Sequence, residues 1–220
     1  MASPLEPRIR AVDALLVERY GDKQWAGPGD PMAGLVRTIL SQNTTDVNSH
    51  QAYQRLRERF PTWAELAAGR PQAIARAIEV GGLGQIKAGY IRDLLRKIRR
   101  QEGDYSLDAL ADMPVEEGMA RLTGYRGVGP KTAACVLLFQ LGRPVFPVDT
   151  HVNRIAGRLG WVTPESPAGK TQAALSGAVP PELCYRLHLN LVQHGRRCCR
   201  TRKPDCPSCP VAAHCQAMGG

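Results

Sequence analysis

Residues 122–134 read Leu-Thr-Gly-Tyr-Arg-Gly-Val-Gly-Pro-Lys-Thr-Ala-Ala, and they predict the end of one helix, a glycine turn and the start of a second helix. Gly127 and Gly129 have no Cβ, so the backbone can turn tightly there and approach another molecule closely. Pro130 suits the first helical position, where its missing N–H costs nothing. The unpaired amides then face outward beside the positive end of a helix dipole, which makes a site for a phosphate. Lys131 lies one step inside this site.

Two other interpretations of this turn need to be weighed. Residues 124–132 nearly match a nucleotide-binding P-loop, but Pro130 separates the second glycine from the lysine. The preceding segment, residues 114–122, also has a helical pattern, whereas that motif follows a strand. The P-loop is therefore excluded. The second interpretation is an ordinary connection between two helices with a solvated lysine. This stretch alone does not exclude it, so the choice depends on the rest of the chain.

The composition points to an intracellular protein with a polyanionic partner. The chain has 220 residues, enough for one large or two small domains, and its 43% hydrophobic content suffices for a packed core. A net charge of +9 favours nucleic acid as the partner. The first ten residues lack the apolar segment of a secretory signal, and no run is long enough to cross a membrane. We expect a cytoplasmic protein with no membrane partner, associated with the nucleoid if it is bacterial.

Apolar residues recur at helical spacing along the chain, and no strand-like alternation of useful length is present, so we predict an all-α fold. The expected helices are residues 6–20, 31–41, 45–60, two short ones opening at 62 and 71, and then 85–101, 106–111, 114–123, 130–141, 150–159, 164–179 and 181–194. In helix 85–101 the predicted apolar side is Ile86, Ile91, Leu94, Leu95 and Ile98. Its predicted polar side is Lys87, Arg92, Arg96, Lys97, Arg99 and Arg100, a charge run typical of a solvated face.

Four cysteines lie close together near the C-terminus: Cys199, Cys206, Cys209 and Cys215. Successive members are separated by six, two and five residues. Four thiolates in one short loop can surround a single metal centre, and soft sulfur ligands suit zinc or an iron–sulfur cluster. The spacing alone favours zinc. Cys198 is a spare thiol beside the set. We interpret Cys135 and Cys184 as core residues, and His194 and His214 as structural.

Basic residues crowd the same loop. Arg196 and Arg197 precede the first cysteine of the set, and Arg200, Arg202 and Lys203 lie between the first two. Because a metal centre would fix the shape of the loop, we interpret this charge as a surface that faces phosphates.

Three features occur in order: the Gly-Val-Gly-Pro-Lys-Thr-Ala turn at 127–133, the Val-Asp-Thr-His-Val step at 148–152 and the four-cysteine loop. Together they resemble endonuclease III, a family of DNA glycosylases in the helix–hairpin–helix superfamily, over about residues 31–215. The resemblance implies two all-α domains with a DNA-binding cleft between them. One is a six-helix barrel with the hairpin, residues 24–143, and the other is an iron–sulfur cluster domain made of residues 1–23 and 144–220. It also implies a [4Fe–4S] cluster, in place of zinc, on the four cysteines.

The resemblance further implies a bifunctional DNA glycosylase and AP lyase of base excision repair that removes oxidised pyrimidines, such as thymine glycol, from duplex DNA. A damaged base must be flipped out of the duplex to be reached. Lys131 matches the residue that attacks the sugar C1′ to form a Schiff base, after which β-elimination cleaves the strand. Asp149 matches its partner, which stabilises positive charge on the sugar and aids proton transfer. Asp149 also suits the cap of the following helix, in which His151 is interpreted as structural. Lys131 and Asp149 are expected to face each other across the cleft.

Several residues match DNA contacts of the family. Gly127 and Gly129 are expected to hold the DNA backbone on one side of the lesion, and the basic residues Arg200, Arg202 and Lys203 to grip it elsewhere. Leu83, exposed in the glycine-rich turn 81–84, matches the wedge that enters the base stack.

Two positions depart from the family's pattern. Gln42 and Asn43 match the polar pair that fills the gap left by the flipped base, but Asn43 stands where the family usually has Gln. This leaves open which of the two side chains fills the gap. Tyr125 and Arg126 replace the usual Leu-Pro before the glycine turn, which changes the apolar support of the hairpin and adds a charge near the DNA.

Two alternatives remain beside this prediction. The first is a monofunctional glycosylase of the same fold that acts on mismatched thymine or uracil, or on adenine; such relatives generally lack a lysine at this position, so Lys131 argues against it. The second is a non-enzymatic DNA-binding module, in which Lys131 and Asp149 would be incidental. Their joint presence favours an enzyme. We expect it to act as a monomer on double-stranded DNA containing damaged bases or abasic sites.

Overall fold

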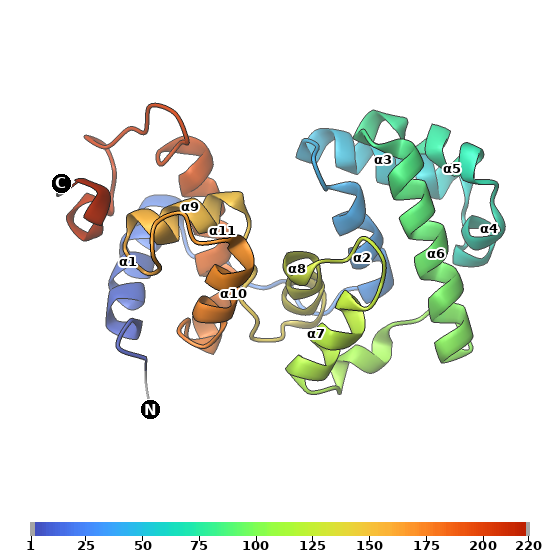
Figure 1. Ribbon diagram of the computed structural model, residues 1–220, viewed down its shortest axis with the longest axis horizontal. Coiled ribbons are helices and arrows are strands. Elements are labelled where there is room, and N and C mark those ends of the chain that lie inside the picture. The colour runs from blue at the N-terminus through green and yellow to red at the C-terminus, as the bar shows by residue number, and fades with distance from the viewer. Residues whose placement is uncertain (1–2, 219–220) are drawn as a thin grey trace. The chain divides into compact units, whose positions relative to one another are not determined.

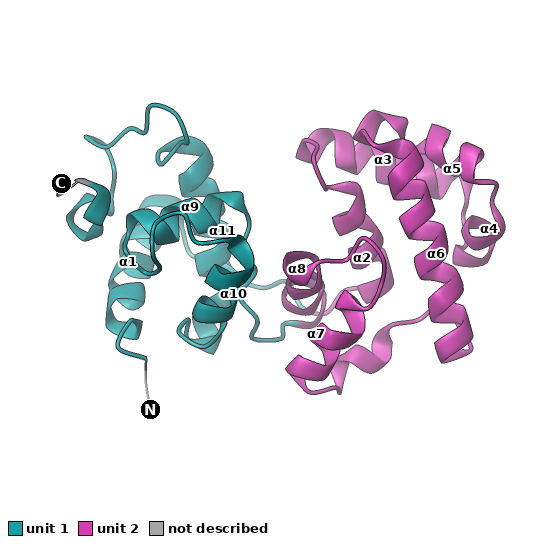
Figure 2. Ribbon diagram, in the orientation of Figure 1, with its two compact units in different colours: residues 1–27, 142–220 teal, residues 28–141 magenta. Residues whose placement is uncertain are grey.

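The computed structural model describes residues 3–218, and within that range every regular element is a helix, as the sequence predicts. The chain forms two compact units, coloured separately in Figure 2: residues 28–141, called the hairpin unit below, and residues 1–27 with 142–220, called the cysteine unit. The units divide after residues 27 and 141, whereas the resemblance places the domain boundaries after residues 23 and 143. None of the described helices is long and apolar enough to span a membrane.

The hairpin unit is a bundle of helices that follow one another along the chain (Figure 1). Its elements are α2 (Pro31–Leu40), α3 (Asp46–Arg59), α4 (Trp63–Ala68), α5 (Pro71–Ala77), η1 (Glu79–Gly81), α6 (Gly84–Glu102), η2 (Asp108–Ala111), α7 (Val115–Thr123) and α8 (Pro130–Leu141). Every residue of α8 from Thr132 to Leu138 is buried, and α8 packs against both α2 and α7. Because a helix that is apolar on all sides belongs in a core, the apolar run after Lys131 accounts for this central position.

Side-chain caps mark the starts of α2 and α3. Asp30 Oδ1 accepts hydrogen bonds from the N–H groups of Met32 and Ala33, at 2.8 and 3.1 Å, where α2 begins. The Thr45 hydroxyl accepts a hydrogen bond from the Asn48 N–H, at 3.2 Å, where α3 begins. Such caps satisfy N–H groups that have no partner inside the helix. The Thr45 cap therefore fixes the end of the loop 41–45 that leads into α3.

The start of α6 differs from the sequence prediction. Ile86, expected on the apolar side, is 50% exposed, and Lys87, expected on the polar side, is 1% exposed. The reason is the position of Lys87 on the helix: it precedes Ile91 by four residues and Ile98 by eleven, so it shares their buried stripe. The later basic residues Arg96, Arg99 and Arg100 are exposed, as predicted.

The cysteine unit joins the N-terminal helix to the C-terminal part of the chain. Its elements are α1 (Glu6–Tyr20), α9 (Thr150–Arg158), α10 (Ala168–Ser176), η3 (Pro181–Leu183), α11 (Cys184–Arg197), η4 (Ala212–His214) and η5 (Gln216–Met218). The guanidinium of Arg186 on α11 donates to Asp13 Oδ2 on α1, from Nε at 3.0 Å and Nη2 at 2.8 Å. Asp13 is 2% exposed, so this buried ion pair holds α1 on α11.

Two predicted helices take a different form. Residues 106–111 were expected to form a helix, and the structure has only the tighter η2 there. The helix expected over 181–194 begins with η3 and becomes α-helical at Cys184. Pro180 and Pro181 restrict the backbone at this start and donate no hydrogen bond, and the first turn closes between the Leu183 N–H and the Pro180 carbonyl at 2.9 Å.

Candidate functional site

The hairpin between α7 and α8 uses its two glycines differently. Gly127 has a φ of +82°, and a Cβ there would collide with the ring of Tyr90, so only glycine fits. Val128 between them is 5% exposed, and its N–H donates to the Tyr125 carbonyl at 3.1 Å. A Cβ at Gly129 would meet nothing within 4 Å. The fold itself therefore requires Gly127, whereas the space beside Gly129 is open to an approaching molecule.

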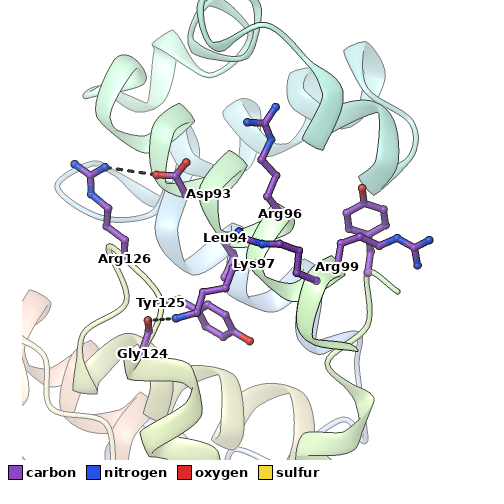
Figure 3. A pocket seen from close by; sticks show the side chains of 10 residues that line it. Asp93, Leu94, Arg96, Lys97, Arg99, Gly124, Tyr125 and Arg126 are labelled. Carbon is purple, nitrogen blue, oxygen red and sulfur yellow. Dashed lines mark hydrogen bonds and ion pairs between the residues drawn. The ribbon is translucent and has the colours of Figure 1, made fainter. Parts of the chain in front are cut away.

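Tyr125, which stands in place of the family's usual leucine, supports the hairpin (Figure 3). Its ring is almost fully buried, and its hydroxyl donates to Gln101 Oε1 at 3.3 Å. Lys97 Nζ donates to the Gly124 carbonyl at 2.8 Å and lies 5.3 Å from the centre of the Tyr125 ring. A cation at this distance from an aromatic face is attracted by it. Tyr125 thus fills an apolar place and adds polar links between the hairpin and α6.

Arg126 adds an exposed charge to the same hairpin. Its side chain is 73% exposed, and its Nη1 lies 3.5 Å from Asp93 Oδ2 on α6. Residues of the hairpin and of α6 line a cavity of about 650 Å³. Its basic lining residues are Arg96, Lys97, Arg99, Arg100 and Arg126. One carboxylate, Asp93, shares this lining, so the hairpin is bordered by positive charge.

Gln42 contacts the hairpin, whereas Asn43 does not share that contact. Gln42 Nε2 donates to the Gly127 carbonyl at 2.9 Å and to Thr132 Oγ1 at 3.4 Å. Asn43 is exposed and has a φ of +52°. Leu83 is 50% exposed with a φ of +53°. Residues other than glycine rarely adopt this left-handed conformation, and such positions cluster at functional sites.

The two candidate catalytic residues lie at the starts of two helices. Lys131 is the second residue of α8, directly after the hairpin, and is partly exposed. Asp149 precedes α9, and its Oδ1 accepts a hydrogen bond from the Val152 N–H at 2.8 Å. Because Lys131 belongs to the hairpin unit and Asp149 to the cysteine unit, their expected approach across a cleft stays a prediction.

The four cysteines of the predicted metal site line one cavity of about 260 Å³ in the cysteine unit. None of the chain's seven cysteines, all in the described range, forms a disulfide. Arg158 reaches the site from α9: its Nη1 donates to Cys199 Sγ at 3.1 Å and to the Arg200 carbonyl at 2.9 Å. A positive donor at this sulfur suits a thiolate ligand.

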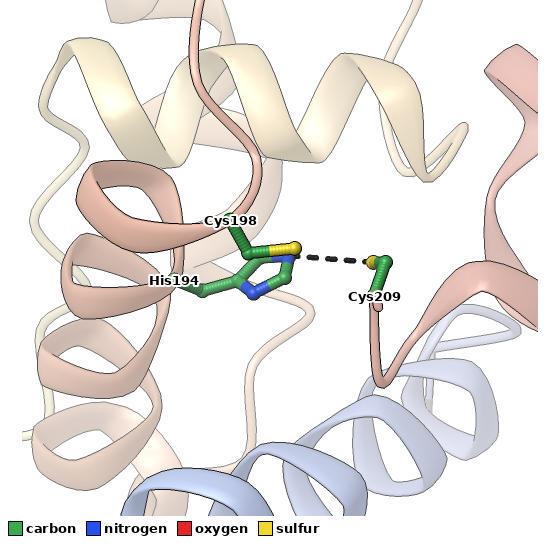
Figure 4. A group of neighbouring side chains, drawn as sticks. All are labelled: His194, Cys198 and Cys209. Atoms are coloured by element: carbon green, nitrogen blue, oxygen red, sulfur yellow. Dashed lines mark hydrogen bonds between the residues drawn. The ribbon is translucent and has the colours of Figure 1, made fainter. Parts of the chain in front are cut away.

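Cys198 also lines this cavity, and the buried His194 lies close to Cys198 and Cys209 (Figure 4). The ligand atoms of these three residues lie within 4.8 Å of one another. His194 Nδ1 lies 3.0 Å from the Tyr20 hydroxyl, and its Nε2 lies 3.7 Å from Cys209 Sγ. Burial, with a smaller effect of Arg154, lowers the pKa of His194 to about 4, so the ring is neutral at physiological pH. Burial also raises the pKa of Cys198 to about 12, and its thiol donates to the Asp205 carbonyl at 3.2 Å.

Arg154 and Arg158 contact the cysteine loop, and the sequence prediction did not include them. Arg154 Nη2 donates to the Cys199 carbonyl at 2.8 Å and to the Gly195 carbonyl at 3.1 Å. Its Nη2 also lies 3.1 Å from His151 Nδ1, which agrees with a structural role for that histidine. Both arginines follow Asp149 on α9, one helical turn apart, and this spacing is the signal that could have found them. The loop residues Arg200, Arg202 and Lys203 are exposed.

The arrangement of α7, the glycine turn and α8 defines a helix–hairpin–helix protein, and comparisons with known proteins agree. Residues 36–181 match the HhH-GPD superfamily of base excision DNA repair proteins. The endonuclease III of Thermotoga maritima is 35% identical over 187 residues, which cover 85% of this chain and 83% of that protein. A protein of Arabidopsis thaliana, provisionally named a DNA glycosylase, is 41% identical over 170 residues, which cover 77% of this chain but 58% of that relative.

A solved structure has the same fold. A non-covalent endonuclease III–DNA complex matches with a TM-score of 0.82 and 25% identity, over 100% of this chain and 98% of that one. The chain therefore belongs to the HhH-GPD superfamily of base excision DNA repair proteins. It is a homologue of endonuclease III with the same all-α fold, as the resemblance implied.

Proposed function

We propose that this protein is a bifunctional DNA glycosylase and AP lyase that removes oxidised pyrimidines from duplex DNA. The observation that carries the proposal is the position of Lys131, the second residue of α8, directly after the Gly127–Gly129 hairpin. A hairpin that holds the DNA backbone would bring this amine to the sugar of a flipped nucleotide. A structural neighbour supports the proposal: a trapped endonuclease III–DNA covalent intermediate, with a TM-score of 0.83 and 25% identity.

The proposed reaction begins when the neutral amine of Lys131 attacks C1′ of the damaged nucleotide. The bond from C1′ to the base breaks, and the base leaves with the bonding electron pair and takes up a proton. The sugar ring then opens to a Schiff base on Lys131, and loss of a C2′ proton expels the 3′ phosphate by β-elimination. Water hydrolyses the Schiff base and restores the lysine. Asp149 would stabilise positive charge on the sugar and carry a proton between these steps.

The contacts of Gln42 and Asn43 support different roles for the two side chains. Gln42 is engaged with the Gly127 carbonyl, so its amide supports the hairpin. Asn43 is exposed, and we propose that it fills the gap left by the flipped base. Leu83 would act as the wedge beside it. Gly129 has open space for the DNA backbone, and Arg200, Arg202 and Lys203 would contact phosphates from the cysteine unit.

We further propose that Cys199, Cys206, Cys209 and Cys215 hold a [4Fe–4S] cluster. A zinc ion with Zn–S bonds of about 2.3 Å would draw four sulfurs to within about 3.8 Å of one another. Within residues 3–218, the compact donor group is instead His194, Cys198 and Cys209, while the four cysteines surround a cavity. This wider arrangement fits a cluster better than a single ion. Such a cluster, when bound, would hold the basic loop in shape; its iron is not needed for the Schiff-base chemistry.

The test is reductive trapping on duplex DNA that contains thymine glycol. With borohydride, the wild-type protein is expected to form a covalent complex with the DNA, and Lys131→Gln is expected to form none while still binding the duplex. Base excision without trapping would favour the monofunctional glycosylase. Binding with neither excision nor trapping would favour the DNA-binding module. Sedimentation of the protein alone and with one duplex tests the proposal that it acts as a monomer.

A further inference from the structure

Lys87 is a buried lysine that the proposed chemistry does not use. It is 1% exposed, and its Nζ donates to the Leu40 carbonyl at 2.8 Å and to the Gly81 carbonyl at 2.8 Å. Leu40 is the last residue of α2, and Gly81 is the last residue of η1. Carbonyl groups at helix ends lack partners within the helix, and a basic side chain can supply them. One amine therefore caps two helix ends from different segments.

Each of these helix ends lies two or three residues before a residue that we propose enters the DNA. Asn43 follows Leu40 by three residues, and Leu83 follows Gly81 by two. Both Asn43 and Leu83 have the left-handed backbone, which persists only where the surrounding structure enforces it. The backbone N–H of Lys87 also donates to the Leu83 carbonyl at 3.0 Å. Lys87 thus holds the Leu83 turn through both its backbone and its side chain.

Gly81 is packed closely against α3 and the end of α2. A Cβ on Gly81 would lie 3.2 Å from Ala52 Cβ and 3.8 Å from the Leu40 carbonyl oxygen. Burial lowers the pKa of Lys87, and a neutral amine still has two N–H donors, one for each carbonyl. The side chain is a fixed link between the two segments in either protonation state.

We propose that Lys87 is a positioning residue for lesion recognition, which holds the loop of Asn43 and the turn of Leu83 at a fixed separation so that both side chains enter the duplex together. The inference rests on the proposed function, because it takes duplex DNA with a lesion as the ligand. Segments that are already in place lose less conformational freedom on binding, which strengthens the complex with a distorted duplex.

The experiment follows side-chain entry without needing catalysis. The probe is a duplex with a tetrahydrofuran abasic analogue next to 2-aminopurine, whose fluorescence rises when it is unstacked. Wild-type protein is expected to raise the fluorescence at saturation. Lys87→Met, which keeps the linear apolar part of the side chain but has no amine to donate a hydrogen bond, is expected to lose most of that rise. Excision of thymine glycol by Lys87→Met is expected to fall by about 10- to 100-fold, because a small misplacement is costly.

Two comparisons separate positioning from a general loss of stability. Ile98→Ala removes a buried side chain at the far end of α6 and should lower the melting temperature without changing the fluorescence rise. Adding Lys87→Met to a variant that already carries both Asn43→Gly and Leu83→Ala should reduce the rise no further, because residues that act through one another are not additive. Lys87→Gln, which is one atom shorter and can reach only one of the carbonyls, should give an intermediate rise and serves if Lys87→Met does not fold.

The possible outcomes are distinct. A wild-type fluorescence rise with Lys87→Met, or a loss equal to that of Ile98→Ala, would overturn the positioning role. Wild-type protein that raises the fluorescence but excises no base would overturn the proposed function and leave the role of Lys87 intact.

Discussion

Asp149 caps the helix that begins beside it, since its Oδ1 accepts a hydrogen bond from the Val152 N–H at 2.8 Å. The carboxylate proposed for catalysis therefore also has a structural role, and the two roles can be separated by substitution. Asparagine caps a helix about as well as aspartate but carries no charge and accepts no proton.

Asp149→Asn is expected to change the free energy of unfolding by less than about 0.5 kcal/mol, because the cap is retained. Its single-turnover excision rate should fall by about 10²- to 10⁴-fold, because the carboxylate is lost. Asp149→Ala loses both roles and should also be destabilised by about 1 kcal/mol. Thermal unfolding and excision measured on both variants check this. An asparagine variant with wild-type excision would rule out the catalytic role.

The pair Gln42 and Asn43 allows a second separation. Gln42→Ala removes the hydrogen bond to the Gly127 carbonyl and should cost about 1 kcal/mol of stability. Asn43→Gly accepts the left-handed backbone without strain and should keep the stability, but it should bind an abasic duplex more weakly. Chemical denaturation and fluorescence titration of both variants provide the measurement. If Gln42→Ala alone weakened DNA binding, the assignment of the gap-filling role to Asn43 would be reversed.

Arg158 is predicted to slow the loss of iron from the [4Fe–4S] cluster that we propose at the cysteine site. Arg158→Met removes the donor to Cys199 Sγ and to the Arg200 carbonyl, so iron should be lost faster to a chelator. Absorbance near 400 nm follows this loss, and Arg202→Met, on the exposed part of the same loop, is the matched control. Equal rates in the two variants would contradict the prediction. Stoichiometric zinc without iron in anaerobically prepared protein would refute the cluster itself.

Arg126 is predicted to contact a DNA phosphate. Its ion pair with Asp93 is long and exposed, so Arg126→Ala should alter stability by less than about 0.5 kcal/mol. The slope of log K against log salt for duplex binding should become shallower by about 1, because one phosphate contact is lost. Arg55→Ala, an exposed arginine on α3, removes the same charge elsewhere in the hairpin unit. An identical slope change in both variants would show a general charge effect.

The sequence predicts most of this fold because the signals that start and end its helices involve residues close together in the chain. Asp30 with Pro31, the Thr45 cap and the glycine turn mark helix ends through contacts a few residues long, and the structure has these helices where they are expected. The family resemblance and the all-α class are confirmed by relatives and by a shared fold. Such features require no knowledge of distant contacts.

What the sequence prediction missed depends on contacts between distant segments. The prediction placed Lys87 on a solvated face because lysine is a charged residue, although its position on the helix belongs to the buried stripe. Its burial is explained by the hydrogen bonds to the carbonyls of Leu40 and Gly81. Arg154 and Arg158 bind carbonyls more than 40 residues away; their spacing places them on one side of α9 but does not indicate which segment they contact. The partnership of Lys131 with Asp149 spans two units and stays a prediction.

The most direct test of the central claim is to locate the covalent bond to DNA. After borohydride trapping on thymine glycol duplex, the protein is digested with nuclease and trypsin and its peptides are analysed by mass spectrometry. We predict that the peptide of residues 127–154 carries the reduced sugar adduct on Lys131, because trypsin does not cleave after this modified lysine or between Arg143 and Pro144. An adduct on any other amine, with Lys131 unmodified, would contradict the account.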